Sequence, residues 1–376
     1  MLDPHLQKLL PPLVDAFLSY LAKHRDHYSP STSQRHGALY PLPRAICRIL
    51  YTFCKVRGVK VISRFLNNEP KHLDPLLRAF IEWDAISQDS PSEVPTSDCL
   101  RRLIWEERYV MLTWLSHLLL APFDLSSMSS DDIPIPHDNL DLPKPLPSLT
   151  PTATKALLSV SLNYVDVPGK EREAATSLLS RLALRGDMQT LSLLPNLTDW
   201  AVSVVSTSAG STEKPSEYTC IGVLSFLARL GASGQVDEFA PLVLPTFEQV
   251  LRLNEEQSEI SKVIRSSASA RKICIKILRT MTAMALSLNE RADGSVSDDK
   301  VSSILEDAID HFLVSLADKD TPVRFAASKA LSLITLKLDP DMATEVIEAV
   351  IGSLEENILF EKPDGALVTP LQAQSK

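Results

Sequence analysis

Residues 301–354 read VSSILEDAIDHFLVSLADKDTPVRFAASKALSLITLKLDPDMATEVIEAVIGSL, and this stretch indicates the fold class most clearly. Its apolar residues recur every three or four positions in three successive blocks, which places them on one face of an α-helix in each block. Only short turns separate the blocks, at Asp318–Asp320 and around Lys337 and Leu338. Amphipathic helices joined by such short turns pack antiparallel. The stretch therefore predicts three consecutive helices that pack on one another.

The same spacing continues through most of the remaining chain, and no stretch shows a convincing strand alternation. It predicts ten further helices, at 5–24, 43–56, 75–86, 100–120, 152–165, 170–185, 189–206, 216–230, 238–254 and 262–288. Thirteen helices in 376 residues recur in pairs roughly every 40 to 60 residues, close to the HEAT and armadillo period of about 40–47. We therefore expect an all-α fold, a HEAT/armadillo-like α-solenoid.

Five predicted helix starts carry an Asp or Thr directly before a proline. Proline at the first helical position loses nothing, because its missing N–H would have no partner there, and the preceding side-chain oxygen can cap the helix. The five pairs are Asp3-Pro4, Asp74-Pro75, Thr150-Pro151, Thr321-Pro322 and Asp339-Pro340.

Composition and motifs argue against several classes of protein. The net charge of −9 disfavours a dedicated nucleic-acid binder, and five widely spaced cysteines indicate reduced thiols in a cytosolic protein. The longest uncharged run, 109–123, is too short to span a membrane and reads as a buried helix, and the first ten residues lack a secretory signal. No phosphate-binding, dinucleotide, nucleophile-elbow or metal-ligand pattern occurs, so we expect no enzyme, no cofactor and no metal site.

The expected domain organisation has four parts. Residues 1–124 form N-terminal helical repeats, and 152–358 form further HEAT-like repeats. Between them lies a Pro/Asp/Ser-rich loop, 125–151, which is too polar to build a core, so we expect a mobile excursion. Residues 359–376 are expected to form a disordered tail.

A basic stretch in the N-terminal third is the first candidate binding surface. Between residues 27 and 68 there are seven Lys and Arg and no Asp or Glu. On the helix predicted over 43–56, the apolar residues are expected on the side opposite to Arg44, Arg48 and Lys55. These apolar residues are Ile46, Ile49, Leu50, Phe53 and Val56. The candidate partner-binding residues are Arg44, Arg48, Lys55, Arg57, Lys60 and Arg64. A solvated helix face would explain the same pattern, whereas a binding surface would suit an acidic partner.

A second constellation, DKDTPVR at 318–324, has the character of a structural HEAT turn. Asp320 lies near the positive end of the following helix, and Thr321 can cap that helix. Arg324 can reach a carboxylate in the neighbouring repeat. Asp318, Asp320 and Arg324 are therefore expected to hold repeats together rather than to bind a ligand.

Three stretches resemble the tubulin-folding cofactor D family of tubulin-specific chaperones. They are YTFCKVRGVKVISRF (51–65), WEERYVMLTWLSHLLLAPFDL (105–125) and DKDTPVRFAASKAL (318–331). The chain departs from the family pattern at Val59, where an aromatic is usual, and at 325–330. Family members are much longer, so the resemblance implies an N-terminal part of such a protein.

The resemblance implies a scaffold that binds β-tubulin and helps to assemble or take apart the αβ-tubulin dimer. The implied partners are β-tubulin and αβ-tubulin, sister tubulin-folding cofactors and an Arf-like small GTPase, without nucleic acid or membrane. The family promotes GTP hydrolysis without being the hydrolase, and its place is the cytoplasm and the microtubule cytoskeleton. Two alternatives stay open: another HEAT scaffold, such as a nuclear transport or phosphatase adaptor, and an unrecognised all-α enzyme with a deep pocket.

Overall fold

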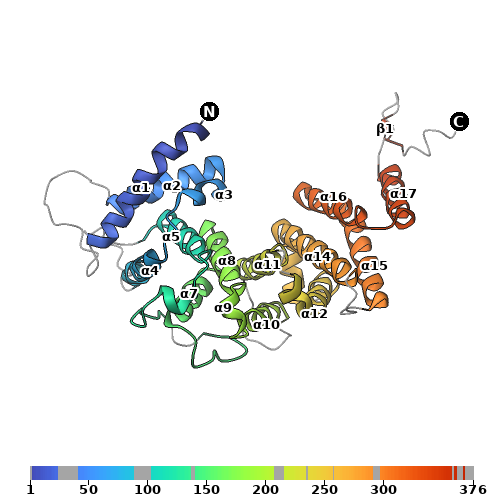
Figure 1. Ribbon diagram of the computed structural model, residues 1–376. Helices are drawn as coiled ribbons and strands as arrows, with labels where there is room; N and C mark the ends of the chain where they lie inside the picture. Colours follow the sequence, from blue (N-terminus) through green and yellow to red (C-terminus); the bar gives the residue numbers. More distant parts are fainter. Residues whose placement is uncertain are drawn as a thin grey trace. The chain divides into compact units, whose positions relative to one another are not determined.

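The structure, a computed structural model, is built almost wholly of α-helices, as predicted (Figure 1). It describes residues 2–23, 41–88, 103–136, 140–206, 216–233, 236–256, 258–290, 297–357, 360–361 and 367–368. The sequence also predicts loops at 87–98, 207–216 and 289–300; most of the first two, and residues 291–296 of the third, lie outside the described residues. Contacts group the chain into two compact units. Unit 1 comprises Met1–Val204 and Tyr218–Arg229, and unit 2 comprises Val205–Glu217 and Leu230–Lys376.

Unit 1 contains the first helices of the chain, with two 3-10 turns. They are α1 (Asp3–Lys23), α2 (Leu42–Arg57), α3 (Val59–Ile62), η1 (Ser63–Phe65), η2 (Pro70–His72), α4 (Leu73–Gln88), α5 (Trp105–Leu118), α6 (Leu125–Met128), α7 (Thr152–Asn163), α8 (Lys170–Ala183), α9 (Gly186–Gln189), nearly all of α10 (Leu193–Ser206) and most of α11 (Glu217–Gly231). The predicted helices of this part are confirmed. The short elements α3, α6 and α9 were not predicted, because four residues are too few to show a helical period.

Helix α5 is the centre of unit 1 and packs against α2, α4 and α8. Leu112, Trp114 and Leu115 are completely buried. The Trp114 ring lies 5.5 Å from the Phe17 ring of α1, and its Nε1 donates to the Asn67 carbonyl at 2.7 Å. The prediction of a buried helix in the uncharged run 109–123 is confirmed as far as Leu118, whereas the run ends in a turn that leaves Leu120 and Phe123 exposed. Among the described helices, none combines the length and the apolar character that a membrane crossing requires.

The expectation that the 125–151 loop leaves the helical body is wrong for its described residues. Leu125, Met128 and Ile133 are buried. Asp74 Oδ2 accepts hydrogen bonds from the backbone N–H and the hydroxyl of Ser130, both at 2.7 Å. Asn196 makes two bonds to the Lys144 backbone, accepting at 3.1 Å and donating at 2.8 Å. Scattered apolar residues and these polar anchors dock the loop, although its average composition is polar.

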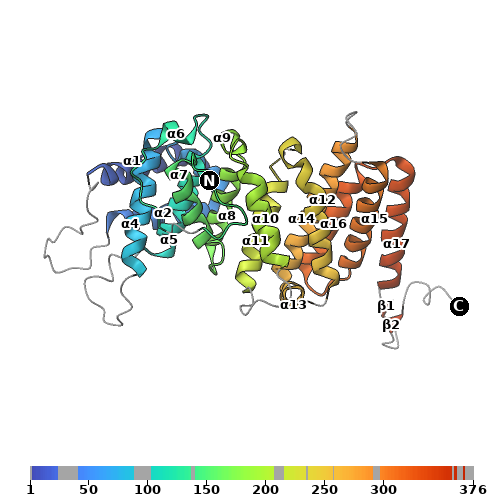
Figure 2. The same ribbon diagram turned by 90° about the horizontal axis from the view of Figure 1, so that it is seen from below.

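Unit 2 contains the remaining helices and a small strand pair. They are α12 (Val236–Glu255), α13 (Glu259–Ser266), α14 (Ala268–Asn289), α15 (Asp298–Ser315), α16 (Thr321–Thr335), α17 (Pro340–Asn357), β1 (Phe360–Glu361) and β2 (Leu367–Val368). Figure 2 shows α12, α14, α15, α16 and α17 side by side, and α14 contacts α12, α15 and α16. The three helices predicted from 301–354 are confirmed.

A serine cap at Ser267 divides what the sequence predicts as one helix over 262–288, and a second cap, at Ser258, begins the first of the two helices. The Ser258 hydroxyl accepts from the Ser261 N–H at 3.1 Å, and the Ser267 hydroxyl accepts from the Ala270 N–H at 3.4 Å. Each serine is an N-cap with extended backbone, so α13 ends and α14 begins at Ser267. The apolar period runs through the break, which is why spacing alone did not show it.

Of the five residues before prolines, Asp339 caps as expected, because its Oδ1 accepts from the N–H groups of Asp341 and Met342 at 3.1 Å each. Thr150 instead donates to the Pro147 carbonyl, and Asp74 lies within the first turn of α4. Thr321 is inside α16, whose N-cap is Asp320. The prolines thus mark helix starts within about two residues, while the predicted capping role is wrong at these three positions.

Most of the predicted tail lies outside the described residues. Its described residues Phe360 and Glu361 pair antiparallel with Val368 and Leu367 in a two-stranded ribbon, and the expectation of a disordered tail stays a prediction. The contact units do not correspond to the repeat boundaries expected at residues 124, 152 and 358. Those boundaries stay a prediction.

Candidate partner-binding surface

Arg44, the first candidate of the basic stretch, is a structural residue. It is 6% exposed, and its Nε lies 3.3 Å from Glu107 Oε2. The same Oε2 accepts from the Ile104 N–H at 2.8 Å, at the start of α5. Burial raises the pKa of Glu107, against the opposing effects of this N–H and of Arg44. The expectation that Arg44 points away from the apolar side of α2 is therefore wrong, because it joins α2 to α5.

The other five basic candidates lie at the surface and differ in their partners. Arg48 Nε is 3.4 Å from Glu106 Oε1, and Arg57 pairs with Asp3. Lys55 on α2, Lys60 on α3 and Arg64 on η1 are exposed and have no acidic partner among the described residues. These three cations are available to an external group.

Apolar side chains accompany these cations on α2. Leu42, Ile49 and Val56 follow one another at intervals of seven residues and are 50%, 43% and 63% exposed. The prediction that Ile49 and Val56 belong to the buried side is wrong, because the helix packs through Pro43, Ile46, Cys47 and Leu50.

We call the exposed residues Leu42, Arg48, Ile49, Thr52, Lys55 and Val56 the α2 outer face. At about 100° per residue, its aliphatic and basic residues form adjacent edges of one exposed strip. Gly58 adopts φ +85° and ends α2, and its N–H donates to the Cys54 carbonyl at 2.9 Å. The chain then turns into α3, so Val59 and Lys60 continue the surface beyond the end of α2. Exposed apolar residues bordered by polar and charged ones mark sites of protein interaction.

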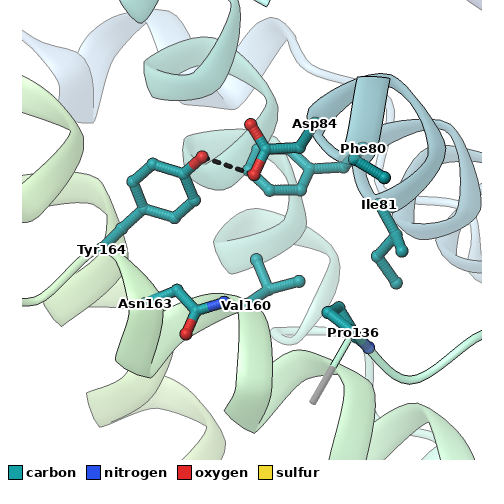
Figure 3. A pocket seen from close by; sticks show the side chains of 8 residues that line it. Phe80, Ile81, Asp84, Pro136, Val160, Asn163 and Tyr164 are labelled. Atoms are coloured by element: carbon teal, nitrogen blue, oxygen red, sulfur yellow. Dashed lines mark hydrogen bonds between the residues drawn. The ribbon is translucent and has the colours of Figure 1, made fainter. Parts of the chain in front are cut away.

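A pocket of about 100 Å³ lies between α4 and α7 (Figure 3) and is a candidate for the active site that the alternative of an all-α enzyme requires. The Tyr164 hydroxyl donates to Asp84 Oδ2 at 2.6 Å, and Arg108 Nε donates to Asp84 Oδ1 at 3.1 Å. Burial, followed by the charge of Asp84, raises the pKa of Tyr164. The titratable groups bond to one another, and ligand pockets usually measure about 300–1,000 Å³. This arrangement favours a role in packing α4, α5 and α7.

The second constellation, at 318–324, is a turn that holds helices together, although the expected residue does not do so. Arg324 donates to the carbonyls of Asp318 and Lys319, at 2.8 and 3.0 Å, and to the Thr321 hydroxyl at 2.8 Å. The link to a neighbouring helix comes from Arg271 of α14, which pairs with both Asp318 and Asp320. The prediction that Arg324 reaches a neighbouring carboxylate is wrong.

Comparison with protein families places the chain. Two family models match it: "Tubulin-specific chaperone D-like, ARM repeat" over residues 1–205, and "Tubulin-specific chaperone D-like, ARM repeats" over residues 244–368. The chain belongs to this family. The resemblance carried by 51–65, 105–125 and 318–331 is confirmed, and the ARM repeats confirm the predicted α-solenoid.

Two curated relatives support the same placement. Tubulin-folding cofactor D of Schizosaccharomyces pombe is 24% identical over 330 residues, which are 84% of this chain and 25% of that protein. Tubulin-specific chaperone D of Dictyostelium discoideum is 22% identical over 405 residues, covering 84% of this chain and 27% of that protein. The chain thus spans about a quarter of the length of these relatives. No solved structure matches it.

Sequence reasoning missed the residues that lie far away along the chain. Glu107, the partner of Arg44, is 63 positions away, and Arg271 is 47 positions from Asp318. It also missed Arg181 and Arg229, which the fold brings to the same pocket as Lys60. A local charge pattern does not show which residues far apart in the sequence come into contact in the fold. The one signal available was the alternation of acidic and basic residues around 318–324, which pointed to the turn but not to its partner.

Proposed function

We propose that this chain is part of a tubulin-folding chaperone scaffold that binds β-tubulin and takes part in assembly and disassembly of the αβ-tubulin dimer. The observation that carries the proposal is the family match over residues 1–205 and 244–368. The proposal includes sister cofactors and an Arf-like GTPase as partners, a non-catalytic contribution to GTP hydrolysis, and a cytoplasmic location associated with microtubules. These are properties of a whole protein, and the chain spans about a quarter of the length of the curated relatives it matches.

The α2 outer face, continued by Val59, Lys60 and Arg64, is the surface we propose for this contact in unit 1. Lys55, Lys60 and Arg64 have no acidic partner among the described residues, so their charge is directed to the solvent. Charges of this kind steer an acidic protein into encounter, while the aliphatic edge supplies apolar area that is buried on docking. Tubulin, as a strongly acidic protein, suits such a surface.

The test measures binding of purified αβ-tubulin to the chain by surface plasmon resonance. In the variant Lys55→Glu/Arg64→Glu, the association rate at low salt should fall by about tenfold, and its salt dependence should flatten. Both residues are exposed and unpaired with acids in the described structure, so thermal melting should be unchanged. A second variant, Ile49→Ser/Val56→Ser, should mainly raise the dissociation rate.

Lys329→Glu/Lys337→Glu is the matched control, because these residues of unit 2 are also exposed and the charge change is the same. Unchanged tubulin kinetics in the Lys55/Arg64 variant, with normal melting, would show that the basic run is a solvated face. Absence of tubulin binding by the unaltered chain would contradict its role as a tubulin-binding portion. In that case a pull-down that recovers transport or phosphatase components would favour the other scaffold.

A further inference from the structure

A second pocket in unit 1 lies beside α3 and has a different character from the Asp84 pocket. It measures about 120 Å³ and is open to solvent. Figure 1 shows the helices that border it, α3, α5, α8 and α11. Its polar lining consists of Lys60, Ser63, Tyr109, Thr113, Ser116, Glu173, Ser177, Arg181 and Arg229. Four helices thus contribute to one small, polar cavity.

The position of α11 in unit 1 is set by close packing. A Cβ atom on Gly222 would lie 1.9 Å from the Val165 carbonyl oxygen, so the helix can approach this closely only because residue 222 is glycine. At the N-terminal end of the same helix, the Arg172 guanidinium lies over the Tyr218 ring, 5.7 Å from the ring centroid. Arg229, two turns beyond Gly222, is brought over α8, where its Nη2 donates to the Glu173 carbonyl oxygen at 3.3 Å.

The pocket has more positive than negative charge. Lys60, Arg181 and Arg229 stand against one carboxylate, that of Glu173, which gives a net charge of +2. The Glu173 carboxylate is also engaged by Lys170 Nζ at 2.7 Å. Among the described residues, neither guanidinium has a carboxylate within ion-pair distance. The cations are therefore not neutralised by the chain itself.

The two arginines use only part of their hydrogen-bonding capacity. Arg181 Nη1 donates to the Ser116 carbonyl at 2.7 Å, and Arg229 has the one bond to the Glu173 carbonyl. Each guanidinium has five N–H donors in a planar fork, so several remain for a ligand. Burial lowers the pKa of both groups, and the charge of Arg229 lowers that of Arg181 further, whereas the charge of Glu173 partly opposes the shift in the pKa of Arg229. An anion placed between them would relieve this repulsion.

Neutral donors complete the lining. The hydroxyls of Ser116 and Ser177 are 3.2 Å apart, with Ser116 almost fully buried, and those of Tyr109 and Thr113 lie on the same side of α5. A carboxylate oxygen can accept from such hydroxyls while an arginine fork binds it through two parallel bonds. The volume is too small for a nucleotide, which needs a larger pocket, and it suits one acidic side chain.

We propose that this pocket binds the carboxylate of a Glu or Asp side chain in an acidic segment of the partner protein. Val59 and Lys60 belong both to the pocket and to the surface that continues the α2 outer face, so a partner docked there reaches the pocket directly. This inference deepens the proposed function and rests on it only for the identity of the partner. It adds a specific anchoring point to the general electrostatic attraction of the surface.

The test uses a fluorescein-labelled oligoglutamate peptide and fluorescence anisotropy on the full 376-residue chain, with oligoglutamine as the uncharged peptide. Arg229→Gln should weaken oligoglutamate binding about tenfold, and Lys60→Gln should weaken it by a smaller factor. Glu173→Gln should strengthen binding, because it removes the one carboxylate that competes with the ligand. Lys8→Gln, an exposed change on α1, serves as the matched control and should leave binding unchanged.

Opposite effects of the Arg229 and Glu173 variants, with melting curves like that of the unaltered chain, would support the pocket. Equal oligoglutamate affinity in all variants, or equal binding of oligoglutamine, would overturn it. If inorganic phosphate displaces the peptide and binds more tightly than the peptide does, the ligand of the pocket is a free anion rather than an acidic protein segment, which overturns the proposal. Tubulin binding is measured separately. Binding of oligoglutamate without binding of tubulin would support the pocket and contradict the proposed function. Binding of tubulin without binding of oligoglutamate would contradict the pocket alone.

Discussion

Replacing Arg271 by Gln tests how unit 2 is held together. Arg271 Nε and Nη2 contact the two carboxylate oxygens of Asp318 at 2.8 and 3.0 Å. Nη2 also donates to Asp320 Oδ2 at 2.6 Å, and Nη1 donates to the Arg265 carbonyl at 2.5 Å. One side chain of α14 therefore bonds both to the end of α13 and to the turn between α15 and α16. Gln is too short and uncharged to replace these contacts.

The size of the effect follows from burial. The side chains of Arg271 and Asp318 are 12% and 16% exposed, whereas Asp320 is 39% exposed. Removing one partner of a buried ion pair costs about 3–5 kcal/mol, and solvation of Asp320 reduces this to about 2–3 kcal/mol here. A domain of 150–250 residues loses about 2–4 °C per kcal/mol, so the melting temperature should fall by about 4–12 °C. Urea unfolding followed by circular dichroism measures the free energy of unfolding, and thermal unfolding followed in the same way measures the melting temperature.

The pH dependence gives a second, independent check. Burial acts to raise the pKa of Asp318, but the hydrogen bonds from Arg271 and from the Asp320 N–H outweigh it and hold that pKa below its ordinary value. A depressed carboxyl pKa stabilises the fold above the unfolded value and loses that contribution as the pH falls through the folded pKa. The difference between the unaltered chain and Arg271→Gln should be constant near neutral pH and shrink below about pH 4.

Lys272→Gln is the matched control for this prediction, because Lys272 is the adjacent exposed residue of α14 and carries the same charge. A loss of less than about 0.5 kcal/mol in Arg271→Gln, equal to the loss in the control, would refute the assignment of the turn as a structural link. A difference that stays constant down to pH 2 would refute the role given to Asp318.

Two further predictions concern unit 1. Arg44→Met should lower the free energy of unfolding, measured in urea, by about 3 kcal/mol, because it leaves the Glu107 carboxylate buried without its cation. The double variant Arg44→Met/Glu107→Gln should recover part of this lost stability. Asn196→Ala should speed hydrogen exchange of the Lys144 N–H several-fold, because that N–H donates to Asn196 and the Lys144 carbonyl accepts from it. The exposed change Asn163→Ala should leave this exchange rate unchanged, and equal rates in both variants would show that the Asn196 bonds do not hold the loop.

The helices could be predicted from sequence because each is specified by local spacing. The blocks at 301–354 gave α15, α16 and α17 from the apolar period alone. The division at Ser267 could not be read this way, since the apolar spacing continues across it and only the serine cap ends the helix. The docking of 125–151 was also hidden, because its buried residues are few and its anchors, Asp74 and Asn196, lie far away in the sequence.

The candidate surface was predicted only in part, for a different physical reason. Residue spacing on α2 correctly placed Ile46 and Leu50 in the core, but which side of a helix is covered depends on its neighbours. Helix α5 supplies a buried carboxylate that draws Arg44 inward, while Ile49 and Val56 stay 43% and 63% exposed. A helical wheel assumes that apolar residues are inside and charged ones outside, and both assumptions fail on this helix.

The partly buried arginines of this fold differ in whether a carboxylate of the chain pairs with them. Arg185 pairs with Asp187 at 2.9 Å and donates to the Leu119 carbonyl at 2.7 Å, which ties the turn after α8 to the end of α5. Arg271 does the same for the turn before α16, and in both cases a nearby Asp neutralises the guanidinium. Arg181 and Arg229 bond to backbone carbonyls but have no such carboxylate among the described residues. Both arginines are half-buried, and a charge that is partly removed from water is stabilised by an opposite charge. These two arginines, rather than the more numerous surface cations, are therefore the ones that the proposed carboxylate of a partner would pair with.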